Sequence, residues 1–377
     1  MFDEKVKRLL KWEKGKKQGP VELQLNPTDR CNLLCKFCWL QDKSRVSYEN
    51  EITDERYMNL IKEAKELDVR SITITGGGEP MVRKNLVLEL VKKIKENDIR
   101  GTLITNGTLF GEKSIKTIVE YCWDEVVFSV DSPKAEIHDY LRECKGCFKK
   151  TIQAIKDFNR IKKELNLHLP KICVHYVLTN KNHDQILEMI EFINKLDVKN
   201  FFVEPVVSVS QDTDYGEKLK LKKSAQIKEA VRQIKKGYKI CCEKEIENNL
   251  EFLYEDLISK VNVMNEVVEK EAKKNANKIK KKSPNGFESV PCFEPFLNVI
   301  IRPNGRVGPC CMFEYTGEYI HDKSLKDIWF GDKFNQARDS LKKGNLMSYC
   351  KQCNPGQVVS NTRIREKMLK AKKENKK

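Results

Sequence analysis

The chain has 377 residues, of which 40% are hydrophobic, and its 71 Lys and Arg exceed its 55 Asp and Glu, giving a formal net charge of +16. It contains no apolar run of about 18 residues, so no transmembrane helix is expected, and the charged N-terminus differs from a signal peptide. We therefore expect a cytoplasmic protein, whose 14 cysteines serve metal binding rather than disulfides.

Short β-rich runs alternate with amphipathic helical patterns over the first 214 residues. The expected strands are 21–25, 71–75, 102–105, 126–130, 172–178 and 201–206, and the expected helices between them are 54–67, 85–97, 112–121, 148–165 and 183–196. Parallel strands need crossover connections, so this order predicts an α/β fold. Six such units fit a partial (β/α)6 TIM-like barrel, with its chemistry at the carboxyl ends of the strands.

The remaining sequence suggests further segments. The expected division is an N-terminal helical segment 1–20, a barrel core 21–214, a charged helical segment 215–283, a C-terminal cluster-binding domain 284–360 and a basic tail 361–377. The Ser-Pro-Asn-Gly stretch 283–286 marks the boundary of the last domain. In that domain, 297–301 and 306–308 predict a β-hairpin, and Ser324 is expected to cap a helix that runs to about Lys343.

Two stretches, 273–282 and 363–377, are locally basic. The simplest interpretation is a solvated helix face and a frayed terminus; binding to RNA or to an acidic partner is the alternative. No nucleic-acid-binding fold signature accompanies the charge.

Three cysteines close together in one loop are the strongest chemical signal. Cys31, Cys35 and Cys38 have C-x3-C-x2-C spacing. Three thiolates can hold three irons of a [4Fe–4S] cube and leave the fourth iron open to a small molecule. A structural zinc site is the alternative, but such sites usually have four ligands.

This loop, with Phe37 in its aromatic position, resembles that of the radical S-adenosylmethionine (SAM) superfamily. The resemblance implies that SAM chelates the open iron. One electron, from an external reductant such as flavodoxin or ferredoxin, then cleaves SAM to a 5′-deoxyadenosyl radical that abstracts hydrogen from a substrate C–H bond.

The segment 75–80, Thr-Gly-Gly-Gly-Glu-Pro, follows the second expected strand. Glycines there allow close backbone approach and positive φ angles. The segment is similar to the family's GGEP motif, which implies SAM contacts for Gly76, Gly77, Gly78 and Glu79. A plain strand-to-helix turn is the alternative.

Three further positions resemble family motifs at strand ends. Asn106 lies in a T-N-G sequence, Ser129 in S-x-D and Arg142 in H-D-x-x-R. In relatives the Ser and the Arg contact the SAM carboxylate, and a guanidinium binds carboxylates well. Ordinary turn and surface roles are the alternative.

A second group of cysteines lies near the C-terminus: Cys292, Cys310, Cys350 and Cys353. Four thiolates suit zinc as well as iron. The pattern C-x12-G-x4-C followed by C-x2-C resembles SPASM or Twitch extensions, which implies one auxiliary [4Fe–4S] cluster held by all four cysteines.

Cys311 occupies the position where sulfatase-maturing relatives carry an Asp base. The resemblance implies a hydrogen-atom donor, as in radical SAM epimerases, and the alternative is a small buried residue. Glu314 is a substitute base candidate. The other six cysteines, Cys122, Cys144, Cys147, Cys173, Cys241 and Cys242, are interpreted as structural.

The leading hypothesis is a radical SAM enzyme that oxidises (dehydrogenates) or epimerises a small-molecule or peptide substrate. A peptide- or protein-modifying maturase is the alternative among enzymes; with 20 residues before the first expected strand, leader-peptide binding would need a separate partner. A zinc-binding, nucleic-acid-associated protein is the alternative of another class, and only the charge favours it.

Overall fold

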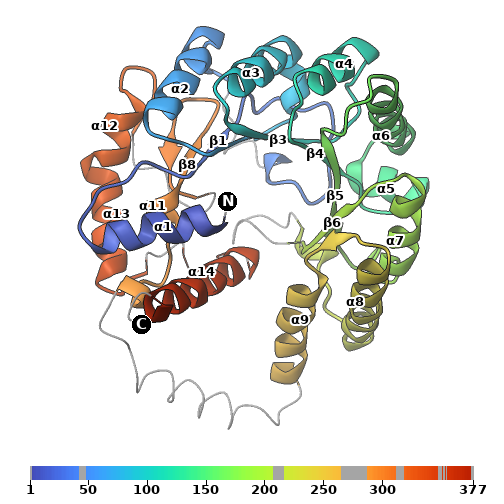
Figure 1. Ribbon diagram of the computed structural model, residues 1–377. Helices are drawn as coiled ribbons and strands as arrows, with labels where there is room; N and C mark the ends of the chain where they lie inside the picture. Colours follow the sequence, from blue (N-terminus) through green and yellow to red (C-terminus); the bar gives the residue numbers. More distant parts are fainter. Residues whose placement is uncertain are drawn as a thin grey trace.

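The computed structural model describes residues 2–41, 48–206, 216–264, 287–310, 318–346, 350, 353 and 355–374. The strands of these residues form one curved sheet in the order β7-β6-β5-β4-β3-β2-β1-β8-β9 (Figure 1). Their bounds are β1 Glu22–Leu25, β2 Ser71–Ile74, β3 Arg100–Thr105, β4 Glu125–Ser129, β5 Lys171–Leu178, β6 Asn200–Pro205, β7 Glu247–Asn248, β8 Asn298–Ile301 and β9 Val307–Gly308. Only β9 is antiparallel to its neighbour.

Helices such as α2, α3, α4, α6 and α7 lie around the outer face of this sheet (Figure 1). The helices of the described residues are α1 Phe2–Glu13, α2 Asp54–Glu66, α3 Lys84–Glu96, α4 Glu112–Glu120, α5 Ala135–Arg142, α6 Cys147–Glu164, α7 Ile186–Lys195, α8 Ser224–Glu243, α9 Leu250–Met264, α11 Glu294–Leu297, α12 Leu325–Phe330, α13 Asp332–Lys342 and α14 Pro355–Glu374, with short 3-10 helices η1 Trp39–Gln41, η3 Pro80–Arg83, η4 Glu217–Leu219 and η5 Phe287–Ser289. The predicted α/β fold of the partial-barrel type is confirmed.

Alternation along the strands separates a packed face from a lumen. On β5, Val174 and Tyr176 are buried in the main core, whereas His175 and Val177 are partly exposed. Since successive side chains point to opposite faces of a strand, the first pair lies beneath the helices and the second faces the lumen. The same alternation on β4 leaves Ser129 on the lumen side.

The predicted C-terminal hairpin is present as β8 and β9, but it does not form a sheet of its own. β8 pairs in parallel with β1, from Glu22 opposite Asn298 to Leu25 opposite Ile301. The hairpin therefore extends the barrel sheet, a pairing that follows from long-range contacts and not from local pattern. The predicted boundary at 283–286 lies outside the described residues.

The predicted single helix from Ser324 to Lys343 is two helices. Ser324 caps α12 as expected, its side chain accepting from the backbone N–H of Asp327. Gly331 then adopts an extended conformation, with φ −75° and ψ 174°, and separates α12 from α13. The expected start of α7 is also three residues early, because Asn182 holds a turn by accepting from the Thr179 backbone N–H.

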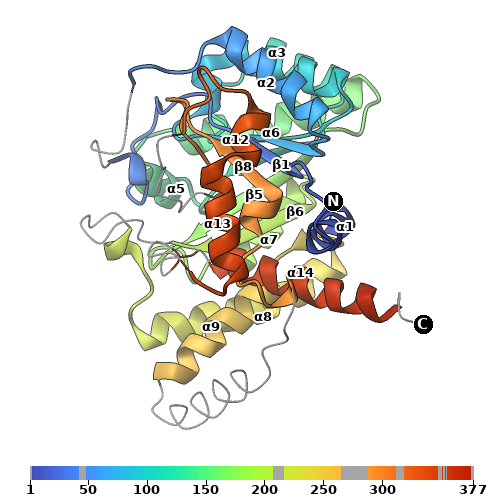
Figure 2. The same cartoon turned by 90° about the vertical axis from the view of Figure 1, so that its left-hand side faces the viewer.

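The expectation of a frayed C-terminus is wrong for residues 363–374, because they belong to α14. Ile364 and Met368 are fully buried, and their i,i+4 spacing puts both on one helix face. α14 lies beside α1 (Figure 2), where Lys372 forms an ion pair with Glu13. The other basic stretch, 273–282, lies outside the described residues. Within the described part of the chain, no helix has the length and apolar character needed to cross a bilayer.

Candidate functional site

The three N-terminal cysteines lie in the loop that follows the carboxyl end of β1. Cys38 donates its backbone N–H to the Cys35 carbonyl, and the Leu33 N–H donates to Cys31 Sγ at 3.4 Å. The Lys36 N–H bonds to the Leu141 carbonyl at 2.9 Å, which ties this loop to the end of α5. The loop is thus held where barrel chemistry was expected.

Two of these thiols open on a common cavity of about 240 Å³. Its lining residues are Cys35, Phe37, Cys38, Trp39, Arg142, Val177, Glu204, Pro205 and Val206. Burial raises the pKa of Cys31 to about 12 and that of Cys38 to about 11, and the pKa of Cys35 is raised as well. Such thiols stay protonated until a metal displaces the proton. Cys35 and Cys38 at this cavity, together with Cys31 in the same loop, fit a [4Fe–4S] cluster with an open iron.

Arg142 fixes a positive charge beside Cys35. Its Nε donates to Asp131 Oδ2 at 2.6 Å and its Nη1 to Cys35 Sγ at 3.7 Å, and its guanidinium lies 5.2 Å from the Phe37 ring centroid. Burial alone would lower the pKa of Arg142, but the Asp131 carboxylate raises it above its ordinary value. The cation is therefore permanent and faces the cavity, where an anionic ligand would meet it.

The three glycines after β2 serve close packing. A Cβ on Gly77 would lie 1.7 Å from Asp29 Oδ1, and one on Gly78 would lie 2.0 Å from the Arg30 carbonyl oxygen. None of Gly76, Gly77 and Gly78 has a positive φ, so that part of the sequence interpretation is wrong. Glycine is needed because this loop touches the chain just before Cys31.

Glu79 joins the loops that follow β2 and β3. Its buried carboxylate accepts from Thr105 Oγ1 at 2.7 Å, from the Asn106 N–H at 2.7 Å and from the Met81 N–H at 3.0 Å. Asn106 in turn donates from Nδ2 to Asn32 Oδ1 in the cysteine loop at 3.0 Å. The two motif residues therefore brace the cysteine loop, a role that the motif comparison did not predict.

The sequence interpretation missed a polar pair on the lumen side of β5 and β6. His175 Nε2 lies 3.2 Å from Glu204 Oε2, and this bond to His175 lowers the pKa of Glu204. His175 is also the register partner of Ser129. The available signal was the alternation of β5 and β6, which puts both residues on the lumen face. The pair presents an ionised carboxylate to the cavity.

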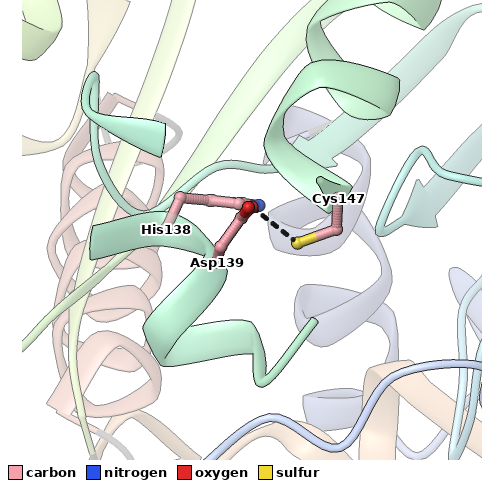
Figure 3. Close-up of side chains that lie close together, drawn as sticks. All are labelled: His138, Asp139 and Cys147. Atoms are coloured by element: carbon pink, nitrogen blue, oxygen red, sulfur yellow. Dashed lines mark hydrogen bonds between the residues drawn. The ribbon is translucent and has the colours of Figure 1, made fainter. Parts of the chain in front are cut away.

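A second group of possible metal ligands is explained by helix capping (Figure 3). Ligand atoms of His138, Asp139 and Cys147 lie within 4.8 Å of one another. However, Asp139 Oδ1 accepts from Cys147 Sγ at 3.2 Å and from the Phe148 N–H at 2.9 Å. His138 Nδ1 accepts from the Asp131 N–H at 3.2 Å, and burial lowers the pKa of His138 to about 4. These hydrogen bonds already use the ligand atoms of all three side chains, and those of Asp139 stabilise the start of α6. This supports the structural role expected for Cys147.

The C-terminal cysteines gather at the opposite end of β8 from the first loop. Cys292 precedes α11 and β8, and Cys310 follows β9. Burial raises the pKa of Cys292 to about 12, with smaller contributions from nearby Cys353 and Cys350. Cys311 and Glu314 lie outside the described residues, so their roles stay predictions.

Helix α14 holds the Cys292 loop in place. The Phe293 N–H donates to Asn361 Oδ1 at 2.7 Å, and Arg365 Nη2 donates to the Val290 carbonyl at 2.9 Å. The basic tail thus bonds to residues on both sides of Cys292 in the sequence. The helix that follows Cys353 therefore positions Cys292.

Comparison with known families gives two matches. The radical SAM superfamily matches residues 25–193, and SPASM, an iron–sulfur cluster-binding domain, matches residues 292–354. The chain is 24% identical over 353 residues, 88% of its length and 86% of the relative's, to the tungsten-containing aldehyde ferredoxin oxidoreductase cofactor-modifying protein of Pyrococcus furiosus. It is 30% identical over 186 residues to the GTP 3′,8-cyclase of Syntrophomonas wolfei, but spans only 54% of that protein.

Solved structures share the fold over nearly the whole chain. Streptococcus suis SuiB bound to the precursor peptide SuiA superposes with a TM-score of 0.66 at 20% identity, covering 93% of this chain and 74% of that one. Native anSMEcpe, with bound AdoMet and the Cp18Cys peptide, superposes with a TM-score of 0.60 at 18% identity, covering 90% of this chain and 88% of that one. These likenesses establish a common architecture.

Proposed function

Because this chain belongs to the radical SAM superfamily and ends in a SPASM iron–sulfur domain, we propose that this radical SAM enzyme modifies a peptide or protein at one of its C–H bonds. The observation that carries the proposal is the cavity at the carboxyl ends of the strands, where Cys35, Cys38 and Arg142 meet. When bound, the cluster and SAM supply a radical able to abstract hydrogen from an unreactive carbon.

The residues that would hold these groups are distributed around the cavity. Cys31, Cys35 and Cys38 would ligate the cluster. The loop 76–79, Asn106 and Ser129 lie on neighbouring strand ends beside them, and Phe37 and Arg142 line the same cavity. The Arg142 cation suits the SAM carboxylate, and the Glu204 carboxylate can accept from a hydroxyl or N–H group of the bound ligand.

A peptide substrate is favoured over a small molecule by the solved relatives, since two structures of this architecture hold peptides. The lumen also offers an accessible surface. Phe202, the register partner of His175 on the lumen side of β6, is 38% exposed. An exposed aromatic inside a barrel provides contact area for a bound substrate.

The finer proposal is that Cys292, Cys310, Cys350 and Cys353 would hold one auxiliary [4Fe–4S] cluster, which would supply an electron acceptor for an oxidation. Four thiolates leave no open iron. The extension of the barrel sheet by β8 supports this role, because it attaches the auxiliary cysteines rigidly to the strand that precedes the first cysteine loop.

Modification of a cofactor is the second candidate. The Pyrococcus furiosus relative has that function in its name and matches 88% of this chain. The substrate of this chain would then be a cofactor and not a peptide.

Deuterium tracing separates the two candidates. The enzyme, reconstituted anaerobically with iron and sulfide, is incubated with SAM, dithionite and either the peptide fraction or the peptide-free metabolite fraction of the source organism grown in deuterated medium. We expect deuterium in 5′-deoxyadenosine from the peptide fraction alone, and none with the Cys35→Ala variant. Deuterium from the metabolite fraction alone would favour the cofactor, and no SAM cleavage in either case would refute the enzyme assignment.

A further inference from the structure

The outer side of the first cysteine loop carries cations around one exposed ring. Lys36 Nζ lies 5.0 Å and Lys181 Nζ 5.9 Å from the centroid of the Tyr140 ring, which is 48% exposed. Lys36 also pairs with Glu143 at 3.1 Å. Lys36 stands between Cys35 and Phe37 in sequence, so this surface lies directly over the loop that would hold the cluster.

A lysine-rich segment continues the same surface. Residues 216–223, Gly-Glu-Lys-Leu-Lys-Leu-Lys-Lys, contain four lysines and one glutamate. Asn180, the neighbour of Lys181, bonds to this segment through its N–H to the Leu219 carbonyl at 2.8 Å and through Nδ2 to the Lys218 carbonyl at 2.8 Å. We name the combination of Lys36, Tyr140, Lys181 and residues 216–223 the lysine surface.

Apolar contacts connect the lysine surface to the cavity. Phe37 packs against the hydrophobic cluster formed by Leu141, Val206 and Leu219, and Phe37 and Val206 also line the cavity. Leu219, which belongs to the lysine-rich segment, is itself buried. A protein bound on this surface would therefore be separated from the cluster site by the side chains of one loop.

We propose that the lysine surface is the docking site of a small acidic one-electron carrier protein, the donor that the proposed function requires. Clustered cations attract a negatively charged partner and raise its association rate. The exposed Tyr140 ring, between two lysines, supplies a flat contact of the kind enriched at interfaces. The electron carrier is favoured over an acidic peptide because electron transfer weakens steeply with distance and this surface lies next to Cys35.

The test measures binding apart from turnover. Oxidised flavodoxin is titrated against the reconstituted enzyme at low salt, and the dissociation constant is compared for the parent and for Lys181→Glu with Lys222→Glu. Lys36 is left unchanged because it adjoins a ligating cysteine. The matched control is Lys163→Glu with Lys195→Glu, the same charge change on exposed lysines at the ends of α6 and α7, the opposite end of the barrel.

We expect the dissociation constant to rise about tenfold in the Lys181/Lys222 variant and to stay near the parent value in the control. Binding of flavodoxin to the parent should weaken as salt is added, because salt screens the attraction between the charges. Flavodoxin-driven formation of 5′-deoxyadenosine should fall while dithionite-driven formation persists. Equal flavodoxin affinity in parent and variant overturns the docking site. So does selective loss of affinity for a synthetic Glu-rich peptide, which would assign the surface to an acidic peptide. If the parent enzyme does not cleave SAM with dithionite, that result would instead count against the proposed function.

Discussion

Arg142 and Asp131 form a buried ion pair, with Nε 2.6 Å from Oδ2, and the same guanidinium donates to Cys35 Sγ. Asp131 also accepts the Val177 N–H at 3.0 Å through its other oxygen. One carboxylate thus fixes Arg142 against β5 and aims it at the cysteine loop. A cation held beside thiolates stabilises their negative charge.

Arg142→Ala should weaken SAM binding while both clusters assemble. Losing a buried charged hydrogen bond costs about 1.5–3 kcal/mol, roughly 10- to 150-fold in affinity. The variant also leaves Asp131 unpaired, so the free energy of unfolding should fall by about 3–5 kcal/mol. Equilibrium SAM titration, iron content and urea unfolding measure the three effects. An unchanged SAM dissociation constant would show that Arg142 serves the fold only.

Gly77→Ala should displace the first cysteine loop. The added Cβ would overlap Asp29 Oδ1, and overpacking of this kind costs about 1–3 kcal/mol. We expect poorer reconstitution of the N-terminal cluster and weaker SAM binding. Gly111→Ala is the matched control, because its Cβ meets nothing within 4 Å, and as an N-cap change it should cost under about 1 kcal/mol. Equal iron content in both variants would contradict the close-packing explanation.

Replacement of Cys292, Cys310, Cys350 and Cys353 by Ala should separate SAM cleavage from product formation. The variant should keep about four irons of about eight and still form 5′-deoxyadenosine slowly, yet give no modified peptide. Cys122→Ala with Cys242→Ala, which removes thiols outside both groups, should behave as the parent. Iron analysis and mass spectrometry of the peptide provide the readouts. Continued oxidation of substrate by the fourfold variant would exclude an electron-accepting role.

Stability should depend on pH through His138. Burial lowers its pKa from 6.5 to about 4, so between these values the unfolded chain binds a proton that the folded chain does not. The free energy of unfolding should therefore fall by up to about 3 kcal/mol as pH drops from 6.5 to 4, and this contribution should then level off.

His138→Asn removes this titration and keeps an acceptor for the Asp131 N–H. Urea unfolding of the metal-free chain from pH 4 to 7 should give a flatter profile for this variant than for the parent, because other acidic groups titrate in both. Identical slopes in the two proteins would show that His138 is not the responsible group.

Local pattern was sufficient for most of the barrel. Alternating strands and 3.6-residue helices follow from side-chain periodicity, which each segment carries in its own sequence. The spacing of Cys31, Cys35 and Cys38 likewise predicted the ligands of the first cluster, because cysteines in one loop lie close together wherever that loop is placed. The second group comes from separate segments, and its role as a ligand set stays a prediction from the resemblance. The hairpin at 306–308 and the Ser324 cap were predictable for the same reason.

Only the tertiary structure decided which distant segments meet. The pairing of β8 with β1, the clamp of α14 on the Cys292 loop and the Glu204–His175 pair join residues far apart in the chain, and no local signal specifies such partners. The tail illustrates the physical reason. Its lysines indicate solvent exposure, but Ile364 and Met368 are buried in the folded chain, where α14 contacts α1. The burial of these side chains outweighs the tendency of a charged helix end to fray.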